Sequence, residues 1–220
     1  LSETKLEHEE CKARHQGMTP TQYLASLGVF DVPVTAAHCV WLEEDFRLFA
    51  EHGATVAHCP QSNLKLGSGI APIARYLEAG ISVGIGTDGT SSNNNLDLLE
   101  EMQDASLLMK GSTGNPALGT AAQVLSMATV AGAKAQQRLD CGSLKVGNRA
   151  DLAVINMDTP AFTPFLDAAN SLVYAANSRD IVLTMVDGEV IFRDGNFLTL
   201  DLERALWECR QRFARITAEV

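Results

Sequence analysis

The stretch ISVGIGTDG, residues 81–89, decides the fold, because an apolar run with β-branched residues passes directly into a polar turn. Two earlier stretches have the same form, PVTAAHCV at residues 33–40 and ATVAHC at residues 54–59. Each is a short apolar run, which predicts a strand.

Helical patterns separate these runs. Residues 43–52 are followed by Gly53 and residues 70–79 by Gly80, and glycine commonly ends a helix. Strand, helix, strand, helix at this spacing predicts parallel βα units. Further helices are expected at residues 3–16, 96–110 and 120–135.

The pattern changes after Asp140. Asp187-Gly188 lies between two apolar runs, residues 181–186 and 189–193, and this arrangement predicts a two-residue β-hairpin. A small antiparallel region is therefore expected after the βα region, with the boundary between residues 135 and 151. Residues 200–220 predict an amphipathic helix.

Composition narrows the class of protein. The chain of 220 residues has 17 Lys plus Arg and 27 Asp plus Glu, a formal net charge of −10, which argues against nucleic acid as a partner. No apolar run approaches the roughly 18 residues that span a bilayer, so no membrane partner is expected. The 5 cysteines are scattered without a CxxC pair, which predicts reduced thiols and a cytoplasmic protein.

Polar side chains end all three predicted strands: His38 ends the first, His58 the second and Asp88 the third. In parallel α/β folds the carboxyl ends of strands line the active site, so we expect the three to share one cleft. Each also has a purely structural interpretation, since a lone histidine is more often a hydrogen-bonded core residue and Asp88 could form an Asx turn or cap a helix. Cys39 and Cys59 are discounted as metal ligands, because adjacent strand residues point to opposite faces.

The loop after Asp88 is crowded with short polar side chains, Ser91 and Ser92 followed by asparagines at 93–95. Such residues suit turn formation, and they equally suit a loop that hydrogen-bonds a polar ligand. Both interpretations stay open.

Longer motifs resemble a known family. AAHCV at 36–40, SNLKLGSGIAPI at 62–73 and GTDGTSSNNNLDLLEEM at 86–102 resemble segments of the amidohydrolase superfamily, and most of all its 5-methylthioadenosine/S-adenosylhomocysteine deaminase branch. GSLKVGNRADLAVIN at 142–156 resembles the segment that leads back into the small β-sandwich of that superfamily. The resemblance implies an α/β fold: strands six to eight of a (β/α)8 TIM barrel in residues 1–140, part of a composite β-sandwich in 141–199, and a C-terminal helix in 200–220.

The resemblance also implies roles for individual residues. Asp88 matches a ligand of the family's metal, usually zinc, and would accept a proton from the attacking water. Glu3 matches the general acid/base glutamate and His38 the histidine that binds the attacking hydroxyl. Glu3 and His38, together with Asn63 and Ser91, would contact the substrate.

Parts of the family pattern are absent. The chain has no His-x-His motif, and no histidine precedes LSET at residues 1–4. We therefore expect a truncated product of a longer gene, rather than a proteolytic fragment or one piece of a split enzyme. Because a catalytic zinc needs about three protein ligands, this chain by itself is expected to hold zinc weakly or not at all through Asp88.

The function that the resemblance implies for the intact enzyme is hydrolytic deamination of an adenine nucleoside, with the isolated chain inactive. Guanine deamination and triazine chlorohydrolysis are alternatives of the same plan, and a non-catalytic half-barrel is an alternative of another class. The isolated chain is expected to associate, as a homo-oligomer or with the remainder of the barrel, through open sheet edges and uncovered apolar side chains. The expected uncovered side chains are Val34, Ala36, Val56, Val83 and Ile85.

Overall fold

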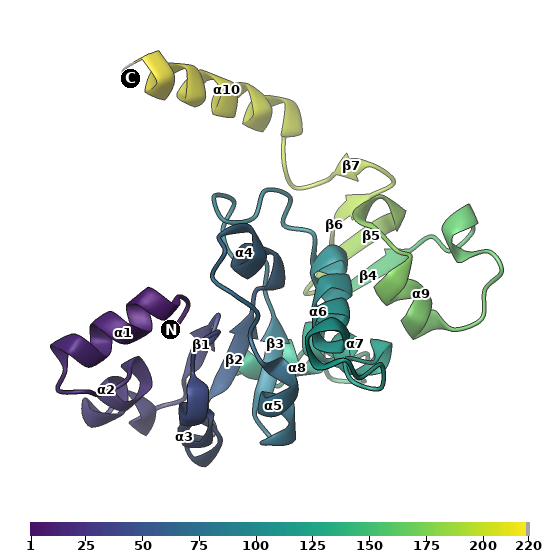
Figure 1. Ribbon diagram of the computed structural model, residues 1–220. Coiled ribbons are helices and arrows are strands. Elements are labelled where there is room, and N and C mark those ends of the chain that lie inside the picture. Colours follow the sequence, from purple (N-terminus) through teal and green to yellow (C-terminus); the bar gives the residue numbers. More distant parts are fainter. Residues whose placement is uncertain (219–220) are drawn as a thin grey trace.

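The computed structural model describes residues 1–218, which form two sheets with helices around them (Figure 1). A parallel sheet of order β1-β2-β3 is built from Thr35–Ala37, Thr55–His58 and Ser82–Ile85. An antiparallel sheet of order β4-β5-β6-β7 is built from Leu152–Ile155, Ile181–Val186, Glu189–Arg193 and Asn196–Phe197. The parallel βα units and the antiparallel region that follows them are as the sequence predicts.

Ten helices accompany the sheets in the described part of the chain. They are α1 (Lys5–Arg14), α2 (Pro20–Ser26), α3 (Phe46–His52), α4 (Pro60–Lys65), α5 (Ile73–Glu78), α6 (Leu98–Thr113), α7 (Ala121–Ala128), α8 (Val130–Ala135), α9 (Ala168–Tyr174) and α10 (Leu202–Ala218). Single 3-10 turns lie at Val29–Asp31, Glu43–Asp45, Pro160–Phe162 and Ser178–Asp180.

Four α-helical features were not predicted from the sequence, and one of them is α9, whose N-cap Asp167 accepts from the Asn170 N–H. The helix expected over 120–135 is two helices, α7 and α8, separated at Thr129, whose backbone is non-helical with φ −122° and ψ −95°. α2 begins with Thr19 and Gln22 in a reciprocal capping box, a signal that its sequence contains. α4 begins at Pro60 directly after β2, where proline suits the first turn of a helix.

The two faces of the parallel sheet are covered by different helices. Ala36, Val56 and Val83 are buried in one apolar core with Phe49 of α3 and Tyr76 of α5. The opposite face carries small residues and packs against α8, and a Cβ on Gly84 would lie 3.0 Å from the Cα of Gly132. Thr35 of that face donates a hydrogen bond to the carbonyl of Ala135.

The expectation that Val34, Ala36, Val56, Val83 and Ile85 form an uncovered apolar surface is therefore wrong. The middle three are buried, and the first and last are partly buried against the same core. The prediction assigned these side chains to the uncovered face of the sheet. Alternation along a strand shows which residues share a face, but only the packing of the helices decides which face is covered.

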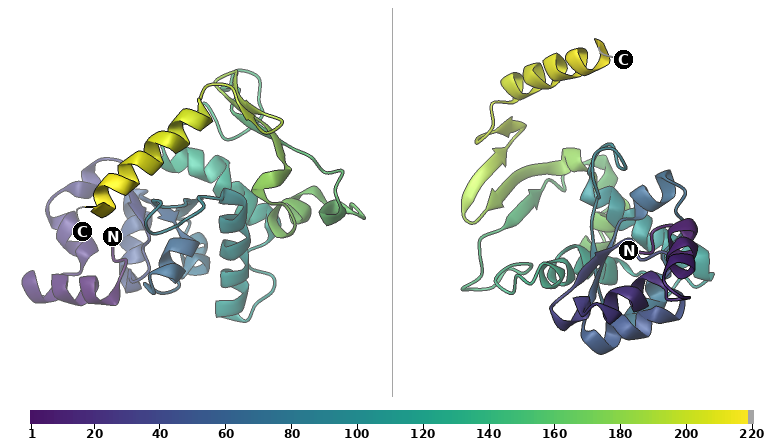
Figure 2. Two further views of the ribbon diagram at one scale, coloured as in Figure 1. Left: turned by 90° about the horizontal axis from the view of Figure 1, so that it is seen from above. Right: turned by 90° about the vertical axis from the view of Figure 1, so that its left-hand side faces the viewer.

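The hairpin between β5 and β6 turns at Asp187 and Gly188, whose φ angles are 52° and 84°. Both lie in the left-handed region that a two-residue hairpin turn requires, which is why Asp-Gly was a reliable signal. Figure 2 shows this sheet reaching away from the parallel sheet toward α10.

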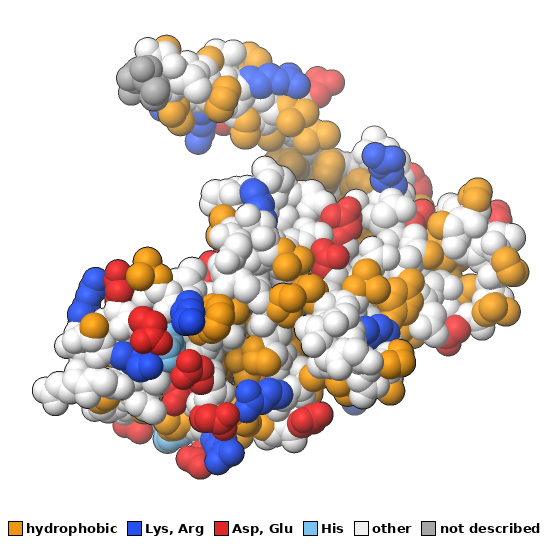
Figure 3. All heavy atoms as spheres, in the orientation of Figure 1, with side chains coloured by type: hydrophobic (Ala, Val, Ile, Leu, Met, Phe, Trp, Pro, Cys, Tyr) orange, Lys and Arg blue, Asp and Glu red, His pale blue; other side chains and the backbone are white. Residues whose placement is uncertain are grey.

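The last helix, α10, projects from the rest of the molecule (Figures 1 and 2) and has no buried side chain. It lies within the predicted span of 200–220, and residues 219 and 220 fall outside the described residues. Figure 3 shows apolar side chains along it. One stripe with alternating spacings of four and three residues consists of Leu202, Leu206, Cys209, Phe213 and Ile216.

We expect this stripe to drive association of the isolated chain, because each exposed aliphatic or aromatic side chain gains roughly 1.5–3 kcal/mol on burial. Leu206→Lys combined with Phe213→Lys is expected to lower the weight-average mass in sedimentation at micromolar concentration. Gln211→Lys, on the polar side of α10, is the control and should leave the mass unchanged. Equal masses for the parent and the double variant would contradict the prediction.

No helix within residues 1–218 is both long enough and apolar enough to cross a bilayer.

Candidate active site

His38 lies between two carboxylates at the carboxyl ends of the parallel strands. Its Nε2 is 3.7 Å from Oε2 of Glu3 and 4.0 Å from Oδ2 of Asp88. His38 follows β1 and Asp88 follows β3, so a parallel sheet places both at one edge, although 50 residues separate them. The structure thus brings together the three residues for which the family resemblance implies catalytic roles.

Glu3 reaches this edge because the first residues of the chain lie beside the end of β1. The amino group of Leu1 donates to the carbonyl of Ala37 at 3.1 Å, and the Cys39 N–H donates to the carbonyl of Leu1 at 3.1 Å. The Trp41 N–H continues the pairing to the carbonyl of Ser2 at 2.9 Å. These three backbone hydrogen bonds hold residues 1 and 2 beside the end of β1, and Glu3 is thereby set against His38.

One short segment, residues 62–68, orients all three side chains of the site. The Ser62 hydroxyl donates to Oδ2 of Asp88 at 2.6 Å, and the Ser68 hydroxyl donates to Oε1 of Glu3 at 3.0 Å. Oδ1 of Asn63 lies 2.9 Å from Nδ1 of His38. When the Nδ1–H of His38 donates to this oxygen, Nε2 is the ring nitrogen that faces the two carboxylates. All three supporting residues are buried.

The structure therefore gives Asn63 a contact that the sequence did not suggest. It was predicted to bind substrate, and it is 1 % exposed with its amide oxygen on His38. The other predicted substrate contact, Ser91, is exposed, and its carbonyl accepts from Nζ of Lys65 at 3.0 Å. Its neighbour Ser92 is the loop serine that contacts Asp88, at 2.7 Å.

Hydrogen bonds stabilise Asp88 as an anion. The Ser62 and Ser92 hydroxyls donate to Oδ2 and the Gly89 N–H to Oδ1, and the pKa of Asp88 is lowered chiefly by the two serines. A carboxylate offers about four acceptor positions, so this pattern leaves capacity for one further partner. Asp88 is thus an oriented carboxylate that is held in its ionised form.

The remaining strand-end residues play a different part. His58 is 2 % exposed, and its pKa is lowered to about 3, chiefly by burial and then by the nearby His38, so its ring is neutral. Burial also raises the pKa of both Cys39 and Cys59 to about 12, which leaves them as thiols. The sequence analysis discounted these cysteines as metal ligands because adjacent strand residues point to opposite faces. That argument does not apply to Cys39, because β1 ends at Ala37, whereas burial of both thiols gives a reason that holds.

Asparagines of the loop after Asp88 make internal contacts. Asn93 is buried and its amide donates to Oε1 of Glu101, while the Asn95 amide donates to Oε2 of Glu100. Oδ1 of Asn94 accepts from Nζ of Lys65 at 2.6 Å. Loop construction accounts for all three side chains.

Glu101 is a buried carboxyl that joins this loop to α4, since it also accepts the Gln61 N–H at 3.1 Å. Burial raises its pKa from 4.5 to about 7. Between those two values the folded chain holds a proton that the unfolded chain has released. Stability from this group is therefore complete below the unfolded value and is lost as the pH rises through the folded value.

Glu101→Gln is expected to remove this part of the pH dependence. The parent's free energy of unfolding should fall, relative to that of the variant, as the pH rises from about 4.5 to about 7 and should then level off. Urea titrations at several pH values measure the difference, with Glu100→Gln as the neighbouring control. A difference between parent and Glu101→Gln that does not change with pH would contradict the prediction.

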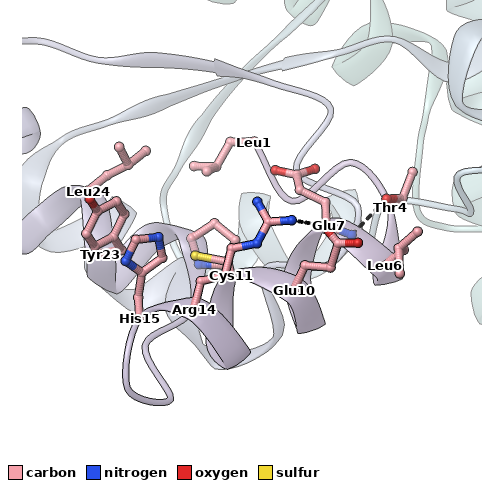
Figure 4. A pocket seen from close by; sticks show the side chains of 11 residues that line it. Leu1, Thr4, Leu6, Glu7, Glu10, Cys11, Arg14, His15, Tyr23 and Leu24 are labelled. Atoms are coloured by element: carbon pink, nitrogen blue, oxygen red, sulfur yellow. Dashed lines mark hydrogen bonds and ion pairs between the residues drawn. The ribbon is translucent and has the colours of Figure 1, made fainter.

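A separate groove lies between α1 and α2 (Figure 4) and is lined by residues of those helices together with Leu1 and Thr4. Figure 4 shows Leu1, Cys11 and Tyr23 beside it, with the Arg14 guanidinium directed at Glu10. Its lining includes none of Glu3, His38 and Asp88. The site is therefore defined by strand-end geometry and not by this groove.

The donor set fits part of a metal site. Asp88 offers an oriented anionic oxygen, and the Nε2 of His38 lies within reach of the same space. Within residues 1–218, however, Glu3, His38 and Asp88 do not form a group whose ligand atoms all lie within 4.8 Å of one another. Asp88 and His38 therefore fall short of the roughly three protein ligands that a catalytic zinc takes.

Known proteins are similar to this chain over its whole length. The Amidohydrolase family model matches residues 1–191. The chain is 45% identical over 217 residues to a 5-methylthioadenosine/S-adenosylhomocysteine deaminase of Pelotomaculum thermopropionicum, covering 98% of this chain and 50% of that protein. The chain thus spans about half the length of the curated relatives it matches.

Two solved structures are similar in fold as well as sequence. An adenosine deaminase from Xanthomonas campestris with bound zinc superposes with a TM-score of 0.93 and 32% identity, covering 99% of this chain and 50% of that one. An atrazine chlorohydrolase from Arthrobacter aurescens, complexed with zinc, superposes with a TM-score of 0.86 and 32% identity. The match covers 93% of this chain and 46% of that one. The chain belongs to the amidohydrolase family.

Proposed function

We propose that this chain supplies the acid–base residues and one metal ligand of a hydrolytic deaminase that acts on adenine nucleosides such as 5-methylthioadenosine and S-adenosylhomocysteine. The observation that carries the proposal is the position of His38, whose Nε2 faces the Glu3 carboxylate at 3.7 Å and the Asp88 carboxylate at 4.0 Å. The names of the relatives support this reaction class.

The residues of this chain divide the proton transfers between them. A bound zinc would lower the pKa of water and so supply a nucleophile at neutral pH. Asp88, kept anionic by Ser62 and Ser92, would accept the proton of the attacking water. Glu3, oriented by Ser68, would hand a proton to the ring nitrogen beside the reacting carbon, and His38 would form a hydrogen bond with the hydroxyl that is added. A C–O bond forms, and the proton taken up by Asp88 would pass to the amino group, so that the C–N bond breaks and ammonia leaves. The proton of the added hydroxyl would return to Glu3, and the oxygen would become the ring carbonyl.

We also propose the place of the chain in the fold of the complete enzyme. The high TM-score over half of the Xanthomonas structure supports β1, β2 and β3 as strands six to eight of a (β/α)8 barrel. Residues 1–140 then belong to the barrel, residues 141–199 to a composite β-sandwich, and α10 closes the chain. A barrel alone takes about 250 residues, so the remaining strands come from outside these 220 residues.

A triazine hydrolase is the second candidate, because the atrazine chlorohydrolase matches almost as well in fold and equally in identity. Guanine deamination follows the same plan. All three replace a substituent on an electron-poor ring carbon with the oxygen of water. The residues named above would serve each of these reactions.

Reconstitution tests the proposal. The chain is fused behind, or co-expressed with, the part of the Pelotomaculum relative that it does not match, loaded with zinc, and assayed against 5-methylthioadenosine, S-adenosylhomocysteine, guanine and atrazine. Ammonia release from the two nucleosides is the expected result, with none from the chain alone. Preference for atrazine or guanine would select an alternative, and a folded, zinc-loaded but inactive assembly would favour a non-catalytic half-barrel.

A further inference from the structure

A second group of metal-binding side chains lies away from the candidate active site. His8 and Glu9 of α1 and Glu43, which begins the turn before α3, bring one imidazole nitrogen and two carboxylate oxygens within 4.8 Å of one another. Among the described residues, this is the group of three His, Cys, Asp or Glu side chains whose ligand atoms all lie within that distance of one another. Its members neither belong to the Glu3–His38–Asp88 site nor line the groove of Figure 4.

The imidazole of His8 is the unusual member. It is 1 % exposed and is the one buried residue of α1, and its Nδ1 lies 3.4 Å from the hydroxyl of the fully buried Ser2. Its Nε2 has no hydrogen-bond partner within residues 1–218, although it is buried. Buried polar atoms are almost always satisfied, so this nitrogen is aimed at a partner that is still to be supplied.

The spacing between His8 and Glu43 suits an ion. Nε2 lies 3.6 Å from Oε2 of Glu43, which is too long for a strong hydrogen bond. Zinc–nitrogen and zinc–oxygen bonds of about 2.0–2.2 Å at a tetrahedral angle place the two ligand atoms roughly 3.3–3.6 Å apart. An ion between these atoms would satisfy both without a change of the buried imidazole.

The two carboxylates are free to complete the site. Glu43 and Glu9 have side chains that are 56% and 51% exposed, so water reaches the ion position from outside. Glu9 contacts Lys12 at 3.3 Å, an exposed pair one helical turn apart that exchanges easily for a stronger partner. One imidazole and two carboxylates are a donor set for zinc and similar first-row divalent ions, whereas calcium and magnesium prefer oxygen alone.

We propose that His8, Glu9 and Glu43 form a second, structural site for a divalent transition-metal ion. The ion would clamp α1 to the segment that follows β1. Glu3 lies two residues before the start of α1, and His38 lies five residues before Glu43. The clamp would therefore hold the two catalytic candidates at a constant separation.

Zinc titration of the full 220-residue chain tests the site, with calorimetry and metal analysis after dialysis. The background is Asp88→Asn, which removes the candidate catalytic ligand. About one zinc per chain is expected to remain in this background. Glu43→Gln, an isosteric change at an exposed side chain, should weaken binding by more than the 10–100-fold that loss of an outer-shell partner costs. His8→Ala should abolish binding.

Two control variants change neighbouring side chains on α1. Glu10→Gln, next to Glu9 but paired with Arg14, should leave the affinity unchanged. Cys11→Ser should do the same, which excludes a thiolate one turn along α1. Thermal unfolding with and without zinc should show stabilisation in the parent and none in folded Glu43→Gln. Absence of bound zinc in the Asp88→Asn chain, or equal binding by Glu43→Gln, would overturn the proposal and leave His8 and Glu43 as a simple ion pair.

Discussion

Asp88→Asn in the reconstituted enzyme is expected to lower kcat by about 10³-fold or more, because general acid–base groups contribute about 10²–10⁴-fold and this residue is also proposed as a metal ligand. Asparagine keeps the size of the side chain and can still accept from the Ser62 hydroxyl. It carries no negative charge and takes up no proton. Steady-state deamination kinetics with matched zinc analysis measure the effect.

The change should be specific to this carboxylate. Asp158→Asn, at an exposed aspartate in the segment between β4 and α9, removes the same charge elsewhere and should leave kcat within about twofold. Ser62→Ala should fall between the two, since it removes the largest hydrogen-bond contribution to the low pKa of Asp88 but leaves the carboxylate. Near-parent activity of a zinc-loaded Asp88→Asn enzyme would assign the proton transfer to another residue.

Tyr76→Ala is expected to destabilise the chain by about 3–5 kcal/mol, the range for removal of a large buried aromatic side chain. Tyr76 is fully buried beneath the parallel sheet, and its hydroxyl donates to the carbonyl of Cys39 at 2.7 Å. That bond ties α5 to the residue after His38. Chemical denaturation monitored by circular dichroism gives the change in the free energy of unfolding.

Two variants separate packing from hydrogen bonding in that effect. Tyr76→Phe keeps the ring and loses the hydroxyl, so it should cost only about 1–3 kcal/mol for the carbonyl left without its partner. Tyr23→Ala removes a partly exposed tyrosine that stacks on His15 and should cost less than Tyr76→Ala. A loss below about 1 kcal/mol for Tyr76→Ala would mean that the core collapses into the vacated space.

Local patterns in the sequence were sufficient for much of the architecture. The apolar run at residues 81–87 and its two predecessors identified the parallel strands, because burial on both faces selects such runs. Asp187-Gly188 identified the hairpin because a two-residue hairpin turn requires positive φ angles at its two central residues, and these two residues adopt them. The placement of His38 and Asp88 at one edge followed from parallel strand order, which the sequence also indicates.

Roles inside the site were accessible only through family resemblance. Without the family resemblance, Glu3 would be taken as one of several acidic residues in a predicted polar helix. No periodicity in the sequence distinguishes it from Glu7. Its position depends on the pairing of Leu1 and Ser2 with the segment after β1, between residues more than 35 positions apart. A contact over that distance leaves no local pattern in the sequence.

The sequence by itself therefore determined the order of βα units, the hairpin and the strand ends that carry His38 and Asp88, because each depends on neighbouring residues. Tertiary structure alone decided which face of the sheet the helices cover, that residues 62–68 support all three site residues, and that His8 meets Glu43. These features arise where segments remote in sequence pack together. Their physical cause is the matching of burial and hydrogen bonds across those segments, which no single segment contains.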